Sequence, residues 1–303
     1  MRNLVLLALV GLVAQLVDGS LGMAYGVTSS TMLLAVGVAP AAASAAVHFS
    51  EIGTTLVSGA AHWKFGNVDW RTVGILAVPG GVGAFFGATF LSGLDGDVAA
   101  PWVALLLTGL GVYVLYRFLR LGGRRPQFKS RPSPLFLAPM GVVAGVMDAI
   151  GGGGWGPVGT TSLLSSGRLE PRKVVGSMDT SEFVVAVGAS AGFLVGLGSA
   201  GINFAWALAL LAGGVVAAPI AAWVVRHLAP RVLGVAAGGF IVLTNAQTMM
   251  ASWFGMDETS STGWVIIGAL ALVWFSLIAN AVSAERAAKR RAAEEEETEP
   301  VTV

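Results

Sequence analysis

Long apolar segments constrain this chain more than any other feature of its sequence. Most of them can cross a bilayer core of about 30 Å as a helix that rises about 1.5 Å per residue. Only 12% of the residues are charged, about half the fraction that is usual in soluble domains. We therefore predict an all-α polytopic membrane protein. The apolar segments cover residues 3–37, 41–62, 72–94, 98–119, 135–166, 172–196, 200–225, 231–251 and 262–283.

The residue counts also exclude several kinds of chemistry. The chain has no cysteine, which excludes disulfides and thiolate metal sites, and its three histidines offer little for a metal centre. The net charge of +1 gives no indication of a nucleic-acid partner. We find no nucleophile with a base beside it, so we predict neither an enzyme nor a cofactor.

Two apolar segments, 3–37 and 135–166, are too long for a single span, and glycines interrupt both of them. The second contains "DAIGGGGWGPVGTTSLL" (148–164), where glycine disfavours a helix and Pro157 lacks an amide donor. Basic loops flank 135–166 on both sides. This segment is therefore expected to enter the membrane and return as two half-helices of about 15 residues each, which meet at the glycines.

Lysine and arginine indicate which loops face the cytoplasm of a cell-membrane protein. Basic residues without nearby acids mark the loop 117–131, and further groups lie near 168–173, 226–231 and 286–291. The connections that hold Asp95 and Asp257 carry no basic residue and are predicted to be external. We thus predict a cytoplasmic C-terminus, with a solvated, disordered tail after Glu285.

An internal repeat relates the two halves of the chain, because residues 13–39 align with residues 143–169. After a one-residue insertion, Pro40, Ser50 and Glu51 match Pro171, Ser181 and Glu182. In the first alignment, Val13, Ala14, Asp18, Gly22, Gly26, Thr31, Leu33, Leu34 and Gly37 recur as Val143, Ala144, Asp148, Gly152, Gly156, Thr161, Leu163, Leu164 and Gly167.

Each repeat is predicted to hold one broken re-entrant hairpin and three spanning helices. An odd number of crossings inverts the second copy, which is a common design among secondary transporters. The predicted units are repeat one (1–120), a basic cytoplasmic linker (121–134), repeat two (135–252), an extra helix (262–283) and a charged tail (284–303). A first segment that crosses the membrane instead would suit Arg2 better but would break the symmetry.

The glycine-rich breaks are suited to binding an anion. The N-terminus of a half-helix offers unpaired N–H groups and about half a positive charge, and glycine lets a ligand approach the backbone closely. No Lys or Arg lies in the middle of an apolar segment, so backbone and hydroxyl groups would have to hold the anion. The hydroxyls could instead bond to the preceding helical turn. The predicted substrate-binding residues are Tyr25, Gly26, Thr28, Ser29, Ser50, Gly153, Gly154, Trp155, Gly156, Thr160, Thr161 and Ser181.

Acidic residues inside apolar segments are expensive to bury and are usually functional. We predict that Asp18, Glu51, Asp148 and Glu182 couple transport to protons or act as gates; Asp179 is the fifth such acid. For Asp18 and Asp148, capping of the exposed amides is the alternative. For Glu51 and Glu182, the alternative is a structural hydrogen bond.

His48 and Glu51 lie three residues apart, a spacing that can bind a metal on a helix. The second repeat has Asp179 in place of His48, and no further histidine lies nearby in the sequence. We therefore interpret His48 as a packed or hydrogen-bonded side chain and predict no metal site.

These motifs resemble the TauE/SafE family of sulfite exporters and organosulfonate permeases. The resemblance covers residues 10–250 and is carried by "DGSLGMAYG…VAP", "DAIGGGGWGP…LEP" and the connection "AAHWKFGNVDW". It implies a membrane transporter for sulfite or a related sulfur-containing anion, without an ATP-binding domain. The first hairpin departs from the pattern because it has fewer glycines than the second.

The resulting hypothesis is a secondary active, proton-coupled exporter of a small sulfur-containing anion. Its partners are the anionic substrate, the proton and the lipid bilayer. Two alternatives stay open: a carrier coupled to sodium or another cation, and an anion channel for a different small solute. The sequence leaves the oligomeric state open.

Overall fold

The structure is a computed structural model that describes residues 2–21, 25–120, 131–160, 162–163, 166, 168–169, 171–224, 230–256 and 260–298. The described residues form helices and connections and contain no strand, which confirms the predicted all-α class. The helices are α1 (Arg2–Leu21), α2 (Tyr25–Ala35), α3 (Pro40–Lys64), α4 (Trp70–Ser92), α5 (Gly96–Arg120), α6 (Pro134–Gly151), α8 (Pro171–Leu197), α9 (Phe204–Val224), α10 (Pro230–Phe254) and α11 (Ser261–Thr298). Two short turns complete them, the π-helical η1 (Trp155–Thr160) and the 3₁₀ turn η2 (Ser199–Gly201).

Among the described residues, five helices are long and apolar enough to span a membrane. Shorter apolar stretches lie in α1 (4–16) and α9 (204–217). The length of α6 would also permit a full crossing, so the predicted re-entry of its hairpin stays a prediction. The five candidate spans are Trp70–Ser92, Gly96–Arg120, Pro134–Gly151, Lys173–Leu197 and Ser261–Ala288.

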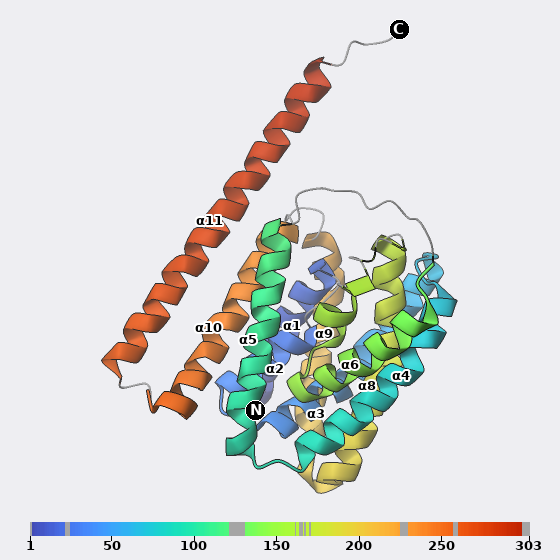
Figure 1. Cartoon of the computed structure of the whole chain (residues 1–303), viewed down its shortest axis with the longest axis vertical. Coiled ribbons are helices and arrows are strands. Elements are labelled where there is room, and N and C mark those ends of the chain that lie inside the picture. The colour runs from blue at the N-terminus through green and yellow to red at the C-terminus, as the bar shows by residue number, and fades with distance from the viewer. Residues whose placement is uncertain are drawn as a thin grey trace.

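Corresponding helices of the two halves have corresponding neighbours. Helix α1 packs against α9 as α6 packs against α4, and α3 packs against α9 as α8 packs against α4. The pairs α3–α8 and α5–α10 join the halves to each other (Figure 1). This exchange of partners agrees with the repeat in the sequence, whereas the inverted orientation of the second copy in a membrane stays a prediction.

Glycines allow the pairs α4–α6 and α1–α9 to pack closely. A side chain at Gly145 of α6 would collide with the Gly80 carbonyl of α4, and one at Gly213 of α9 would collide with the Ala8 carbonyl of α1. Small residues are typical of helix contacts in membranes, where close backbone packing replaces the hydrophobic effect as the attraction between helices.

Basic side chains near several helix ends donate hydrogen bonds to backbone carbonyls of neighbouring segments. Arg71 donates to the Pro132 carbonyl at 3.4 Å, and Lys173 donates to the Val68 carbonyl at 3.3 Å. Arg231, at the start of α10, donates to the Leu119 carbonyl at the end of α5 at 3.0 Å. The contacts show that these positively charged ends are neighbours in the fold.

Helix α11 differs from the prediction in its length. It begins at Ser261 as expected but continues to Thr298, where the sequence predicted a disordered tail after Glu285. Its last part is rich in Ala, Glu, Arg and Lys, which are strong helix formers. In Figure 1, α11 extends well beyond the other helices and lies along α10.

Candidate functional site

The two predicted helix breaks are both present. Helix α1 ends at Leu21 and α2 begins at Tyr25, while α6 ends at Gly151 and η1 begins at Trp155. Gly152 lies between α6 and η1 with a φ of 68°, a left-handed conformation that favours glycine. Helix α6 has 18 residues, η1 has 6, and Ser162 and Leu163 are helical again, while residue 161, between η1 and Ser162, lies outside the described residues. Pro157 lies inside η1, where it cannot donate to a regular helical ladder.

The breaks lie directly against each other. A side chain at Gly26, in the first turn of α2, would collide with the Gly152 carbonyl of the second break. A side chain at Gly153 would likewise collide with the Val27 amide nitrogen. Glycine is therefore required at this crossing because the two backbones touch.

Asp148 caps the second break. Its Oδ1 accepts hydrogen bonds from the amides of Gly154 at 2.7 Å and Trp155 at 2.9 Å, and its side chain is 1% exposed. These are N–H groups that we predicted for an anion. The carboxylate of Asp148 therefore occupies amides that were predicted to bind an anion, as the capping alternative describes.

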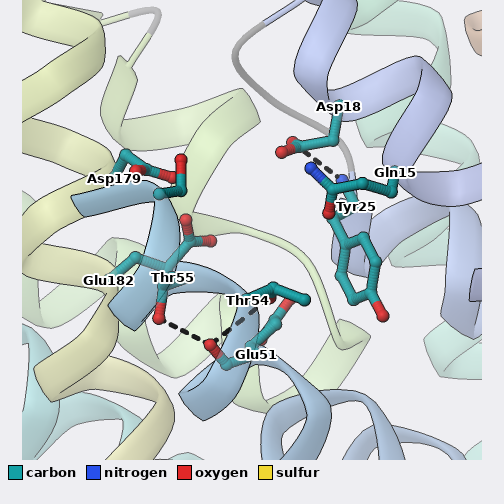
Figure 2. A pocket seen from close by; sticks show the side chains of 9 residues that line it. Gln15, Asp18, Tyr25, Glu51, Thr54, Thr55, Asp179 and Glu182 are labelled. Atoms are coloured by element: carbon teal, nitrogen blue, oxygen red, sulfur yellow. Dashed lines mark hydrogen bonds between the residues drawn. The ribbon is translucent and has the colours of Figure 1, made fainter. Parts of the chain in front are cut away.

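Asp18 has the same position in the first break but makes fewer bonds. Its Oδ1 accepts from the Tyr25 amide at 3.1 Å, and this contact is only partly buried (Figure 2). In each break, therefore, an acid of the first half-helix accepts a hydrogen bond from an amide at the start of the segment after the break.

His48 connects helix α3 to the second break. Its Nε2 lies 3.1 Å from Asp148 Oδ2, and its Nδ1 lies 2.8 Å from the Ser44 carbonyl oxygen. Ser44 Oγ in turn donates to the Ala149 carbonyl at the end of α6. The imidazole is fully buried and packs near the Phe193 ring. The prediction of a hydrogen-bonded histidine is therefore correct as far as it goes.

Glu51 lies one turn further along α3 and faces the same cluster. Its Oε2 is 3.9 Å from His48 Nε2, and the side chain is 2% exposed. Neither carboxylate oxygen has a hydrogen-bond partner among the described residues. The ligand atoms of His48, Glu51 and Asp148 all lie within 4.8 Å of one another, a grouping that could hold a cation.

A narrow polar cavity opens beside Glu51 (Figure 2). Its lining comes from α1, α2, α3 and α8, and Glu182 and Asp179 lie across the cavity from Asp18 in the view of Figure 2. No lysine or arginine is among these described lining residues. The lining consists of Gln15, Asp18, Tyr25, Glu51, Thr54, Thr55, Ser58, Asp179 and Glu182.

An aromatic residue after each break is anchored to the long helix of its own half. The Tyr25 hydroxyl lies 3.0 Å from Ser50 Oγ, and Trp155 Nε1 donates to the Met178 carbonyl at 3.0 Å. Ser181 Oγ donates to the same carbonyl at 2.8 Å. Tyr25 lines the cavity, whereas Trp155 is 1% exposed and lies in the core of the bundle.

The other predicted substrate-binding residues that the structure describes are buried and do not line the cavity. Thr28 and Ser29 each have a buried hydroxyl without a hydrogen-bond partner among the described residues, and so does Ser30, which the site prediction did not include. Gly156 and Thr160 belong to the buried turn η1. Thr161 lies outside the described residues.

The structure adds residues to the site that the site prediction omitted. Asp179, Gln15 and Thr55 line the cavity, and His48 binds Asp148. Asp179 could have been included because it is an acid in an apolar segment, at the position that matches His48 in the other repeat. The contact between His48 and Asp148 joins residues 100 positions apart, and no sequence spacing indicates it.

Comparisons with known proteins agree on one family. The family described as "Sulfite exporter TauE/SafE" matches residues 7–248. A protein of Bacillus subtilis (strain 168), named "Probable membrane transporter protein YtnM", is 52% identical over 281 residues, which is 92% of each chain. No solved structure matches this chain.

Proposed function

This chain belongs to the sulfite exporter TauE/SafE family and is a membrane transporter, and we propose that it exports sulfite or a related small sulfur-containing anion by proton-coupled secondary active transport. The observation that carries the proposal is the polar cavity beside the first helix break, which Asp18 and Tyr25 help to line. Acids from both halves of the chain converge there, on α1, α3 and α8.

The anion is proposed to bind at the amides of the breaks, in particular those of Gly154 and Trp155. The unpartnered hydroxyls of Thr28 and Ser29 on α2 are further donors. This assignment keeps the predicted substrate-binding set, with Gly26 and Gly153 as the positions that let the two breaks approach. Amides at such a break can replace arginine or lysine as the source of positive potential.

The acids of the cavity are proposed to carry the coupling proton. A carboxylate buried away from cations is stabilised when it takes up a proton. Glu51 is the clearest candidate, because its oxygens have no partner among the described residues. Glu182 is the equivalent acid of the second repeat, while Asp18 and Asp148 lie at the amides themselves.

Flux measurements in proteoliposomes test the proposal. Purified protein is reconstituted with a trapped pH-sensitive dye, and radiolabelled sulfite and proton movement are recorded together, with protein-free liposomes as the leak control. We expect sulfite movement to carry protons, and we expect Glu51→Gln and Glu182→Gln to abolish the proton movement. Sulfite flux that equals the leak would contradict the proposed substrate, and wild-type coupling in the double variant would contradict the roles of the two acids.

The four acids of the cavity also favour a second candidate, a sodium-coupled carrier. Carboxylate oxygens are ligands for a hard cation. The same liposomes distinguish the candidates when a sodium gradient is applied without a pH gradient. Sulfite accumulation driven by sodium alone would favour the second candidate, and accumulation driven by the pH gradient alone would favour the first.

A further inference from the structure

The contacts of His48 point to a mechanism by which a proton and an anion exchange places at the second break. We infer that His48 passes the coupling proton from Glu51 to Asp148, and that protonated Asp148 releases the amides of Gly154 and Trp155 to the transported anion. The inference rests on the proposed function and deepens it, because it assigns a proton path and explains why a carboxylate occupies the anion-binding amides.

The hydrogen bonds of His48 define where a proton lies. Ser44 Oγ gives its own proton to the Ala149 carbonyl, so it is an acceptor toward His48 Nδ1 at 3.2 Å. The Ser44 carbonyl is an acceptor as well, and Nδ1 therefore carries a proton. Nε2 then faces Asp148 Oδ2 at 3.1 Å, and a hydrogen bond there needs a second proton on one of the two atoms. The pair His48–Asp148 is thus a place that holds a mobile proton.

Glu51 is the entrance to this pair. It lines the polar cavity, it is buried, and its Oε2 lies 3.9 Å from His48 Nε2. Because neither of its oxygens has a partner among the described residues, no existing hydrogen bond must break before Glu51 turns toward His48. A proton taken up in the cavity can therefore reach the buried imidazole.

The transfer conserves protons and charge. With the shared proton on Nε2, the Nε2–H bond of the imidazolium first breaks as an O–H bond forms at Asp148 Oδ2. The O–H bond of Glu51 then breaks, and a new N–H bond forms at His48 Nε2. Glu51 ends as a carboxylate and Asp148 as a neutral carboxyl group, while His48 returns to its initial state. The proton on Nδ1 does not move, because the two Ser44 acceptors hold it.

Protonation of Asp148 changes what the second break binds. A neutral carboxyl oxygen is a weaker acceptor than a carboxylate, since charge-assisted hydrogen bonds are about twice as strong. The amides of Gly154 and Trp155 donate hydrogen bonds to Asp148 Oδ1 at 2.7 and 2.9 Å. Once these bonds weaken, the amides are free to bind an anion. Proton and anion therefore load together. A doubly charged anion with one proton carries net negative charge, which an inside-negative membrane potential drives outward.

Several other titratable groups face this path. Asp18 comes from α1, Tyr25 from α2, and Asp179 and Glu182 from α8, all of them in the cavity lining beside Glu51. Any of these acids can supply the proton to Glu51. His48 differs from these groups because it contacts Asp148 directly, and no other described histidine does so.

The test is the number of protons moved per sulfite in proteoliposomes. His48→Gln keeps a polar side chain of similar size but cannot carry the proton, and His62→Gln, near the end of the same helix, is the matched control. We expect His48→Gln to lose sulfite exchange together with proton movement, because the Asp148 carboxylate then keeps the amides of Gly154 and Trp155. Its proton movement should fall roughly a hundredfold or more, as when a proton-transfer group is removed. His62→Gln should match the wild type in both measurements.

Each result separates the inference from the proposed function. If the wild type moves sulfite without protons, the proposed coupling fails. If the wild type couples and His48→Gln couples equally, only the inference fails. Asp148→Asn imitates the protonated acid and provides a second test if His48→Gln does not fold. This variant should exchange sulfite without moving protons. Loss of exchange would overturn the inference. Stoichiometric binding of Zn²⁺ to the wild type that His48→Gln removes would also overturn it, since the cluster would then be a metal site.

Discussion

The two helix breaks have the same place in their repeats, but their acids have different partners. Asp148, in the second break, accepts hydrogen bonds from two backbone amides and contacts the imidazole of His48. Asp18, in the first break, accepts one amide and faces the polar cavity, where Asp179 lies in place of a histidine (Figure 2). His48 and Asp179 are equivalent positions of the repeat. One residue difference thus gives one break a closed acid–base pair and the other an open, acid-lined cavity.

This comparison indicates that the two helix breaks have different roles in proton transfer. The open side, with Asp18, Asp179 and Glu182, is suited to exchanging protons with water. The closed side, with His48 and Asp148, is suited to storing a proton next to the amides. Glu51 belongs to both sides, because it lines the cavity and lies near His48.

The largest expected difference between the breaks is in stability. Asp148→Ala leaves its three buried partners, the amides of Gly154 and Trp155 and His48 Nε2, without this contact, at about 1–3 kcal/mol for each, so we expect it to lower the free energy of unfolding by about 3–9 kcal/mol. Asp18→Ala removes the acceptor of one amide and should cost about 1–3 kcal/mol. Denaturant titration of the purified protein in detergent micelles measures both. Equal losses would show that the two acids have equivalent structural roles.

His48→Asp makes the closed side resemble the open one. It replaces the imidazole by a carboxylate opposite Asp148, and breaking a buried ion pair in this way costs about 3–5 kcal/mol. We expect a corresponding loss of stability in the same titration and an absence of proton-coupled sulfite flux. A variant of wild-type stability would mean that the contact between His48 and Asp148 contributes nothing.

Asp179→His is the reverse change and should have a smaller effect of opposite sign. It gives Asp18 and Glu182 a basic neighbour and removes a carboxylate whose Oδ2 has no partner among the described residues. One new charge-assisted hydrogen bond would stabilise the protein by about 1.5–3 kcal/mol at most. Thermal unfolding monitored by tryptophan fluorescence measures the change, and a lower midpoint than in the wild type would contradict the expectation.

Tyr25→Phe should have the smallest effect. It removes only the hydroxyl, which contacts Ser50 Oγ and also donates to the Leu210 carbonyl at 3.4 Å, and a neutral hydrogen bond is worth about 0.5–1.5 kcal/mol. The apolar ring contacts of Tyr25 with its cluster are retained. Thermal unfolding should shift slightly, and sulfite flux should fall only in part, because the amides of the second break still bind the anion. Unchanged flux would remove the Tyr25 hydroxyl from the proposed substrate-binding set.

The sequence predicted the elements of this fold well because apolar length and glycine are local signals. The break at Gly152 and the repeat of Asp18 as Asp148 followed from such signals. The length of α11 was missed because its charged end contains strong helix formers that composition alone describes as a tail.

The site was predicted only in part, because its contacts are long-range. Asp148 was correctly placed at the exposed amides, and the capping alternative describes its geometry. Its partner His48 comes from the other repeat, and in the sequence that residue is one polar position of an apolar span. The π-helical η1, where Pro157 and Gly159 follow the break, also differs from the regular half-helix predicted after the glycines.

An experimental structure of the protein in lipid with sulfite bound tests the central claim most directly. The account predicts anion density within hydrogen-bonding distance of the Gly154 and Trp155 amides, with the Asp148 carboxyl group turned away from them. Sulfite bound elsewhere, with both amides still donating to Asp148, would contradict the claim that substrate and carboxylate compete for this helix break.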